Sequence, residues 1–212
     1  MKLQLAYDGI HLDDAVRCIE QIQEYVDIIE IGTPFVLSVG MEGVRTMRRL
    51  FPEKEILADM KIMDGGKKEA EMAFESGADY VTMLGVTDRA TIAACVKAAK
   101  QYEKKTVVDM ICVPDFRKTV ADVEALGVDY IAVHTGSDQQ LLGRTPLEDL
   151  KEIQQYVKNC RIVVAGGINS STVQEYLSYH PDILIVGKSI TQAKNPKEEA
   201  RRIKEAMERA VI

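Results

Sequence analysis

The sequence predicts a single compact (β/α)8 TIM barrel spanning residues 1–212. Eight short apolar runs rich in Val and Ile alternate with longer amphipathic segments along the whole chain. Strict alternation of strands and helices favours parallel strands joined by right-handed crossovers. Eight such units favour a closed barrel over the main alternative, an open Rossmann-like sheet, and no G-x-G-x-x-G follows the first run.

The eight predicted strands are brief enough to be buried between helices on one side and the barrel interior on the other. They cover residues 3–7, 28–31, 56–60, 80–84, 106–111, 130–133, 162–165 and 183–186. Among the segments between them, residues 13–23 and 114–126 carry apolar residues at the spacing of one helix face.

Local signals mark where several helices begin and end. Gly77 and Gly127 each precede a predicted strand, and Gly suits the position just past a helix end. Ser171 and Gln174 have the spacing of a capping box at the start of the seventh helix. Pro196, followed by two acidic residues, is typical of the first turn of the last helix.

Composition excludes several classes of function. A net charge of −6 argues against sequence-independent binding of nucleic acid, which requires a basic surface. No apolar run approaches the ~20 residues of a membrane span, and the N-terminus is too polar for a signal peptide. The four cysteines form no C-x-x-C pair, so neither a zinc site nor a disulfide framework is expected. We therefore expect a cytoplasmic enzyme with reduced thiols.

Charged residues occur where barrel strands should be apolar. All of them lie at or near the carboxyl ends of the predicted strands, which is the catalytic face of such barrels. They are Asp8, Glu30, Asp59, Lys61, Asp109 and His134. Asp59 and Lys61 are two residues apart, so we expect both to point to the same face. Any one of these could belong to a structural ion pair, but six at one rim favour an active site.

The residue types indicate the chemistry. Glu30 and Asp59 offer carboxylate oxygens on neighbouring strands, which suits Mg²⁺ or Mn²⁺ rather than zinc. A divalent ion there could hold two substrate oxygens and stabilise an enediolate. Lys61 could add positive charge at the same oxyanion. His134, at a strand end, suits proton transfer near neutral pH.

Glycines follow the seventh and eighth strands, where barrels commonly bind phosphate. Gly166 and Gly167 follow one, and Gly187 and Lys188 follow the other. Bare backbone lets an anion approach closely, and Lys188 could add a charge. The alternative is that these glycines only form tight turns.

These residues and their spacing resemble those of a known family. The run 57–64 resembles the D-x-K-x-x-D motif of the orotidine 5'-monophosphate decarboxylase suprafamily. Four further segments, residues 27–34, 108–111, 133–136 and 165–168, are similar to those of the 3-hexulose-6-phosphate synthases within it. The resemblance covers essentially the whole chain.

The resemblance implies an Mg²⁺-dependent aldolase, with Mn²⁺ as a substitute ion, that condenses ribulose 5-phosphate with formaldehyde. It implies that Glu30 and Asp59 hold the metal and that Lys61 stabilises the enediolate. It also implies that His134 moves the proton with Asp109 beside it. Substrate contacts fall to Asp8, Gly136, Gly166, Gly167, Gly187 and Lys188. A homodimer is implied, in which Asp64 reaches the partner's site.

Two alternatives stay open. The first is 3-keto-L-gulonate 6-phosphate decarboxylase, which shares the metal site and the enediolate. Those enzymes typically have Glu in place of Asp109 and an Arg shortly after His134, whereas Thr135-Gly136-Ser137 contains none. Conversely, Gly187-Lys188-Ser189-Ile190 looks more like the decarboxylase, and Ser137 stands where synthases often have an aromatic. The second alternative is a non-catalytic barrel that binds a phosphosugar.

Overall fold

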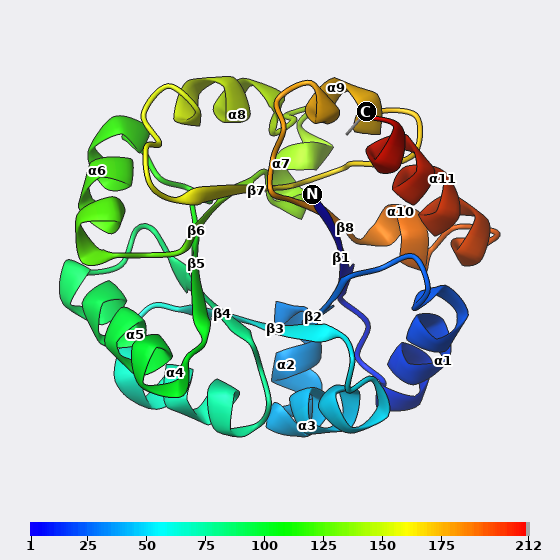
Figure 1. Cartoon of the computed structure of the whole chain (residues 1–212), viewed down its shortest axis with the longest axis horizontal. Helices are drawn as coiled ribbons and strands as arrows, with labels where there is room; N and C mark the ends of the chain where they lie inside the picture. The colour runs from blue at the N-terminus through cyan, green and yellow to red at the C-terminus, as the bar shows by residue number, and fades with distance from the viewer. Residues whose placement is uncertain (211–212) are drawn as a thin grey trace.

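The computed structural model describes residues 1–210 and confirms the predicted barrel. Eight parallel strands follow one another in chain order, and β8 pairs with β1 to close the ring (Figure 1). This closure excludes the open Rossmann-like sheet. The strands are β1 (Lys2–Tyr7), β2 (Ile28–Ile31), β3 (Glu55–Ile62), β4 (Tyr80–Leu84), β5 (Lys105–Asp109), β6 (Tyr130–His134), β7 (Arg161–Ala165) and β8 (Ile183–Val186).

Helices surround the strands on the outside (Figure 1). Residues 1–210 form eleven of them, because the connections after β2, β6 and β8 each contain two. They are α1 (Leu12–Ile22), α2 (Thr33–Val39), α3 (Met41–Leu50), α4 (Gly66–Glu75), α5 (Arg89–Tyr102), α6 (Phe116–Leu126), α7 (Ser137–Leu141), α8 (Leu147–Ile153), α9 (Val173–Leu177), α10 (Lys188–Thr191) and α11 (Pro196–Arg209). None is long and apolar enough to cross a membrane.

Two of the three kinds of helix-end prediction are confirmed. Gly127 ends α6 in the left-handed conformation, with φ 81°. Pro196 begins α11, and the Asn195 side chain caps it by accepting a hydrogen bond from the Glu198 N–H. The predicted capping box at Ser171 is wrong. The Asn169 side chain instead accepts hydrogen bonds from the N–H groups of Ser171 and Thr172, so α9 starts later, at Val173.

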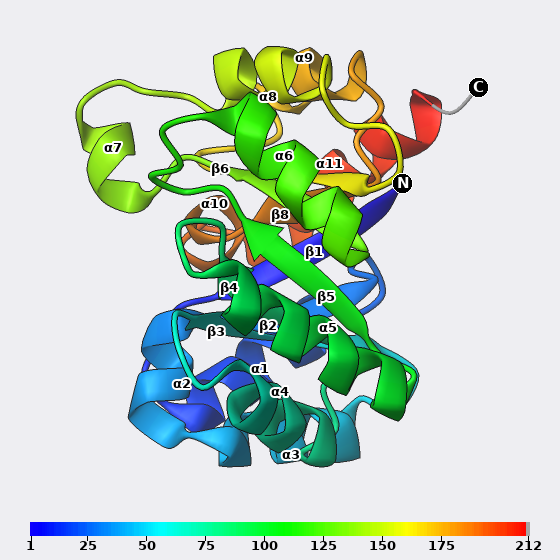
Figure 2. The same ribbon diagram turned by 90° about the vertical axis from the view of Figure 1, so that its left-hand side faces the viewer.

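The core lies in two layers separated by the barrel wall. The larger one fills the space between strands and helices. The smaller one fills the amino-terminal half of the barrel interior, where Tyr80 and Tyr130 meet edge to face with ring centroids 5.7 Å apart. Because large side chains occupy that end, the interior remains open only toward the carboxyl ends of the strands. Figure 2 shows α7 standing out from the body of the barrel beyond β6.

Candidate active site

A cavity of about 580 Å³ opens at the carboxyl ends of the strands. The predicted site residues that line it come from β2, β3, β5 and β6 and from the segments that follow β1, β6, β7 and β8. They are Asp8, Glu30, Asp59, Lys61, Asp109, His134, Gly136, Gly166, Gly167, Gly187 and Lys188. Of the described residues predicted for the site, only Asp64 lies outside this lining. The fold therefore brings together residues from nearly the whole length of the chain.

Lys61 lies between two buried carboxylates at the centre of the cavity. Its Nζ is 2.9 Å from Asp59 Oδ2 and 2.9 Å from Asp109 Oδ2. Burial by itself would lower the pKa of Lys61, but the two adjacent carboxylates outweigh it and raise the pKa above its usual value. Lys61 is therefore positively charged throughout the physiological range.

Asp109 joins Lys61 to His134. Asp109 Oδ2 is 2.8 Å from His134 Nδ1, and Oδ1 accepts a hydrogen bond from the Ile111 N–H at 2.9 Å. A proton on Nδ1 satisfies the contact with Asp109 and leaves Nε2 to face a substrate. Burial opposes the charged form of Asp109. The hydrogen bond and charge of His134, together with Lys61, nevertheless lower its pKa to about 2.

This low pKa predicts a specific dependence of stability on pH. The folded-state pKa of Asp109 lies below the unfolded value of about 3.9. The carboxylate therefore contributes stability that is complete above about pH 4 and is lost as the pH falls toward 2. We expect the difference in free energy of unfolding between the parent and Asp109→Asn, measured by urea titration, to shrink below pH 4. A difference that stays constant from pH 6 to pH 2 would contradict this.

Two further carboxylates face the same cavity. Burial and the charge of Asp59 raise the pKa of Asp8, and they raise the pKa of Glu30 well above its usual value. Glu30 Oε2 accepts a hydrogen bond of 2.5 Å from the side chain of Gln4, which is fully buried. The side-chain oxygen of Gln4, Oε1, is buried without a partner among the described residues. Asp8, Glu30 and Asp59 thus form a crowded carboxyl cluster in which burial and mutual repulsion oppose full ionisation.

The donor set fits a hard divalent cation. Asp8, Glu30 and Asp59 supply oxygen only, and a cation would offset both the burial and the repulsion from Asp59 that raise the pKa of Glu30. In residues 1–210, no three His, Cys, Asp or Glu side chains are spaced to enclose an ion by themselves. Mg²⁺ typically binds through one or two carboxylates and completes its shell with water and substrate oxygens. Glu30 and Asp59, the ligands that the sequence predicts, could supply two such carboxylates.

The opposite side of the cavity is built from backbone. Gly166 has φ 126°, and a Cβ there would lie 2.7 Å from the carbonyl oxygen of Thr135. Gly167 also has a positive φ, 69°. Lys188 Nζ lies 3.4 Å from Ser137 Oγ, which brings the loops after β6 and β8 together beside these glycines. Bare backbone and one lysine suit a phosphate group.

We expect Gly166→Ala to weaken both the fold and substrate binding. The left-handed backbone and the contact with Thr135 should lower the free energy of unfolding by about 1–3 kcal/mol. Displacement of Thr135, next to His134, should raise KM for the phosphosugar. Gly143→Ala is the matched control, because Gly143 also has a positive φ, 81°, but nothing within 4 Å of a Cβ. Equal KM values for the two variants would contradict the role given to Gly166.

Asp64 lies in the loop after β3, where it is exposed to solvent. Its Oδ1 accepts a hydrogen bond of 2.7 Å from the N–H of Gly65. The carboxylate is thus held at the rim rather than inside its own cavity. Its predicted role in a neighbouring subunit's site stays a prediction.

Several polar residues of this cavity were not predicted from the sequence, among them Gln4, Thr33, Thr82 and Gln140. Thr33 Oγ1 donates to Asp59 Oδ2 at 2.7 Å, and Gln140 Nε2 donates to the Thr135 carbonyl at 2.7 Å. Gln4 had a detectable signal, since it is polar within an otherwise apolar strand. Threonine carries no such signal, because β-branched residues are common in strands for packing reasons alone.

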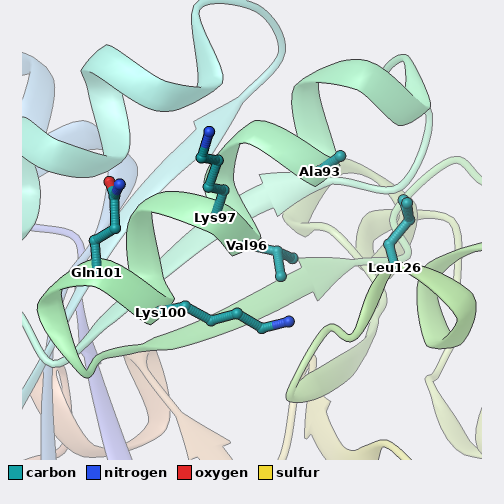
Figure 3. A pocket seen from close by; sticks show the side chains of 6 residues that line it. All are labelled: Ala93, Val96, Lys97, Lys100, Gln101 and Leu126. Atoms are coloured by element: carbon teal, nitrogen blue, oxygen red, sulfur yellow. The ribbon is translucent and has the colours of Figure 1, made fainter.

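A second hollow, of about 400 Å³, lies on the outside of the barrel between α5 and α6. Figure 3 shows Val96 and Lys100 on the side of α5 that faces Leu126. Its lining consists of aliphatic side chains, two lysines and a glutamine, with no carboxylate or histidine for acid–base chemistry. The cavity at the strand ends is therefore the candidate active site.

Comparison with known proteins agrees with this fold. The chain is 43% identical to a 3-hexulose-6-phosphate synthase from Bacillus subtilis, over 97% of this chain and 98% of that protein. The crystal structure of 3-hexulose-6-phosphate synthase from Salmonella typhimurium matches with TM-score 0.98 and 48% identity, over 99% of this chain and all of that one. A ligand-bound KGPDC from Streptococcus mutans matches with TM-score 0.91 and 29% identity, over 99% of this chain and 98% of that one.

A family model provides the remaining comparison. The model described as the orotidine 5'-phosphate decarboxylase / HUMPS family matches residues 1–203. This range includes all eight strands and every residue predicted for the site. The chain belongs to the orotidine 5'-phosphate decarboxylase / HUMPS family.

Proposed function

We propose that this protein is a 3-hexulose-6-phosphate synthase, a carbon–carbon lyase that reversibly joins D-ribulose 5-phosphate and formaldehyde. The observation that carries the proposal is the row formed by Asp59, Lys61, Asp109 and His134, with each contact at 2.8 or 2.9 Å. The row places the positively charged Lys61 and His134, which can carry a proton, in one cavity. The full-length likeness to synthases from two bacteria supports the choice of substrates.

The chain's own residues account for the proton movements. His134 Nε2 removes a proton from C1 of ribulose 5-phosphate, while Asp109 holds the imidazole through Nδ1. The electron pair of the C–H bond forms the C1–C2 double bond of an enediolate, whose negative oxygen Lys61 stabilises. C1 then attacks the formaldehyde carbon, and the ketone at C2 is restored. His134 returns its proton to the former formaldehyde oxygen, which becomes a hydroxyl group.

We also propose that the reaction requires Mg²⁺, for which Mn²⁺ can substitute, held by Glu30 and Asp59. Bound there, the ion supplies Lewis-acid stabilisation of negative oxygen on the substrate. Asp8 contacts the substrate beside it, and its raised pKa reflects that crowded position. Gly136 and Gly166 contact the substrate, and Gly167, Gly187 and Lys188 bind the phosphate end of the sugar.

A paired assay tests the reaction. We expect ribulose 5-phosphate to drive the consumption of formaldehyde in the presence of Mg²⁺, and EDTA to abolish it until the metal is restored. The second candidate is 3-keto-L-gulonate 6-phosphate decarboxylase, abbreviated KGPDC, because the Streptococcus mutans KGPDC has nearly the same fold. Release of CO₂ from 3-keto-L-gulonate 6-phosphate faster than the aldol reaction would move the assignment there. Absence of both activities would favour a non-catalytic phosphosugar-binding barrel.

We further propose a homodimer in which Asp64 completes the partner's site. Asp64 is exposed at the rim, and the segments after β2, β3 and β4 each expose a large apolar side chain, namely Leu37, Met63 and Val86. Mixing Asp64→Asn with His134→Asn subunits tests the sharing. Each variant alone should be nearly inactive, whereas an equal mixture should recover about a quarter of the parent activity, because half the dimers are mixed and each has one intact site. No recovery in a proven heterodimer would overturn this arrangement.

A further inference from the structure

One buried hydroxyl links the two central charged residues of the site. Thr82, on β4, is 6% exposed. Its Oγ1 donates a hydrogen bond to Asp59 Oδ1 at 2.7 Å and accepts one from the backbone N–H of Lys61 at 2.9 Å. A hydroxyl has one proton, so accepting from the Lys61 N–H leaves that proton free to point at Asp59. The two bonds thus support one another.

The backbone around Lys61 explains why such a link is needed. Lys61 has φ 45°, in the left-handed region that side-chain-bearing residues rarely adopt. The pairing of β3 with β4 shifts register between Ala58 and Ile62, so regular pairing is interrupted at Lys61. The Thr82 hydroxyl therefore satisfies a backbone N–H that the strand ladder leaves out.

The side chain of Lys61 depends on this backbone. Its Nζ reaches both Asp59 and Asp109, which point into the cavity from β3 and β5. With regular pairing, the direction of the Lys61 side chain would follow from the alternation along β3. Here the bulge and the left-handed backbone set that direction instead. Strained conformations of this kind persist only where surrounding contacts hold them.

We propose that Thr82 is a positioning residue that holds Asp59 and the backbone of Lys61 in one fixed arrangement for catalysis. It acts through these two residues and not by its own contact with the reacting atoms. Its loss leaves all charges of the site in place but frees their relative position. This inference rests on the proposed synthase activity, although its physical basis, the bond to the Lys61 N–H, can be measured without it.

Thr82→Val tests the proposal because valine keeps the shape and removes the hydroxyl. We expect kcat to fall by about 10- to 100-fold, the range that a misplacement of about 1 Å produces, with little change in KM. The amide of Lys61 should exchange with solvent faster in Thr82→Val than in the parent, as measured by NMR. Thr82→Ser, which keeps the hydroxyl, should retain most of kcat and the protection of that amide.

The chain offers a matched control at the other end of the barrel. Thr106 is also buried, donates to the side chain of Asp129 at 3.1 Å and accepts from the Asp129 N–H at 3.2 Å. Thr106→Val should therefore cost similar stability in thermal unfolding but leave kcat near the parent value. Should Thr82→Val fail to fold, Thr82→Ser and Thr82→Cys form a second pair, which differ only in hydroxyl against thiol.

The results separate this proposal from the proposed function. Inactivity of the parent would overturn the synthase assignment. The exchange rate of the Lys61 amide would still test the hydrogen bond from the Lys61 N–H to the Thr82 hydroxyl. Parent-like kcat in Thr82→Val, or in Thr82→Cys if valine does not fold, would overturn the positioning role. An unchanged exchange rate of the Lys61 amide in the same variant would overturn it independently. Equal losses of kcat in Thr82→Val and Thr106→Val would show a general effect on stability and would also overturn it.

Discussion

Asp59→Asn is expected to lower kcat for formaldehyde condensation by about 10³-fold, because a bound cation supplies several kcal/mol of charge stabilisation. The substitution changes one oxygen to an amide and little else in shape. Asp59 has contacts on both oxygens, with Thr82 and Lys61 at Oδ1 and with Thr33 and Lys61 at Oδ2. An amide nitrogen in either place can neither bind Mg²⁺ nor accept these hydrogen bonds.

Direct binding of Mn²⁺ separates the loss of metal from other effects. We expect electron paramagnetic resonance titrations without substrate to show that Asp59→Asn binds Mn²⁺ far more weakly than the parent. Lys61 keeps its contact with Asp109 at 2.9 Å in this variant, so the Lys61 ammonium group remains paired with a carboxylate. Parent-like Mn²⁺ affinity together with a large loss of kcat would show that Asp59 is not a metal ligand. The loss of kcat would then come from the altered contact between residue 59 and Lys61.

Asp79→Asn is the matched control for this charge change. Asp79 directly precedes β4 at the amino-terminal end of the barrel, where it pairs with Arg48 and with Lys104, the latter at 2.6 Å. Its side chain is 23% exposed, so it is also largely enclosed. We expect Asp79→Asn to lower the midpoint of thermal unfolding but to keep kcat and Mn²⁺ affinity close to those of the parent. A comparable loss of kcat would show that Asp59→Asn acts through stability.

His134→Asn is expected to lower kcat by about 10²- to 10⁴-fold, the range that positioned acid–base groups contribute. The amide nitrogen of asparagine can take the place of Nδ1 and preserve the 2.8 Å contact with Asp109. The variant therefore removes Nε2, the atom proposed to carry the proton, and leaves the network beneath it. Exchange of the C1 hydrogen of ribulose 5-phosphate in D₂O, followed by NMR without formaldehyde, should slow by a similar factor.

His180→Asn provides the comparison for the histidine. His180 is exposed, lies between α9 and β8, and has φ 48°, a conformation that asparagine tolerates. We expect it to leave both the exchange and the complete reaction unchanged. If His134→Asn exchanged the C1 hydrogen at the parent rate while the aldol reaction was lost, His134 would serve only the second half of the reaction. That outcome would overturn its role as the base.

Much of the fold can be predicted because its signals are local. Each predicted strand begins and ends within two residues of the observed one, since buried parallel strands are short apolar runs between turn signals. The helix pairs after β2, β6 and β8 could not be predicted in the same way, because helices such as α7 and α10, with five and four residues, are too short for a clear period. Likewise Asn169 provides the cap expected from Ser171, since several polar side chains there compete for the same N–H groups.

The order of apolar runs and charged residues along the chain is enough to predict the fold class and which charged residues gather at the carboxyl ends of the strands. Both follow from the order of the elements, because a barrel brings all strand ends to one rim. The arrangement of Asp59 and Lys61, by contrast, depends on contacts between strands in the folded barrel. The two residues do meet, as alternation predicts, yet they do so across a bulge with Lys61 in the left-handed region. The hydroxyl of Thr82 and the carboxylate of Asp109 come from other strands. Their hydrogen bonds with Lys61 therefore depend on how the strands are spaced in the folded barrel, which no local sequence pattern shows.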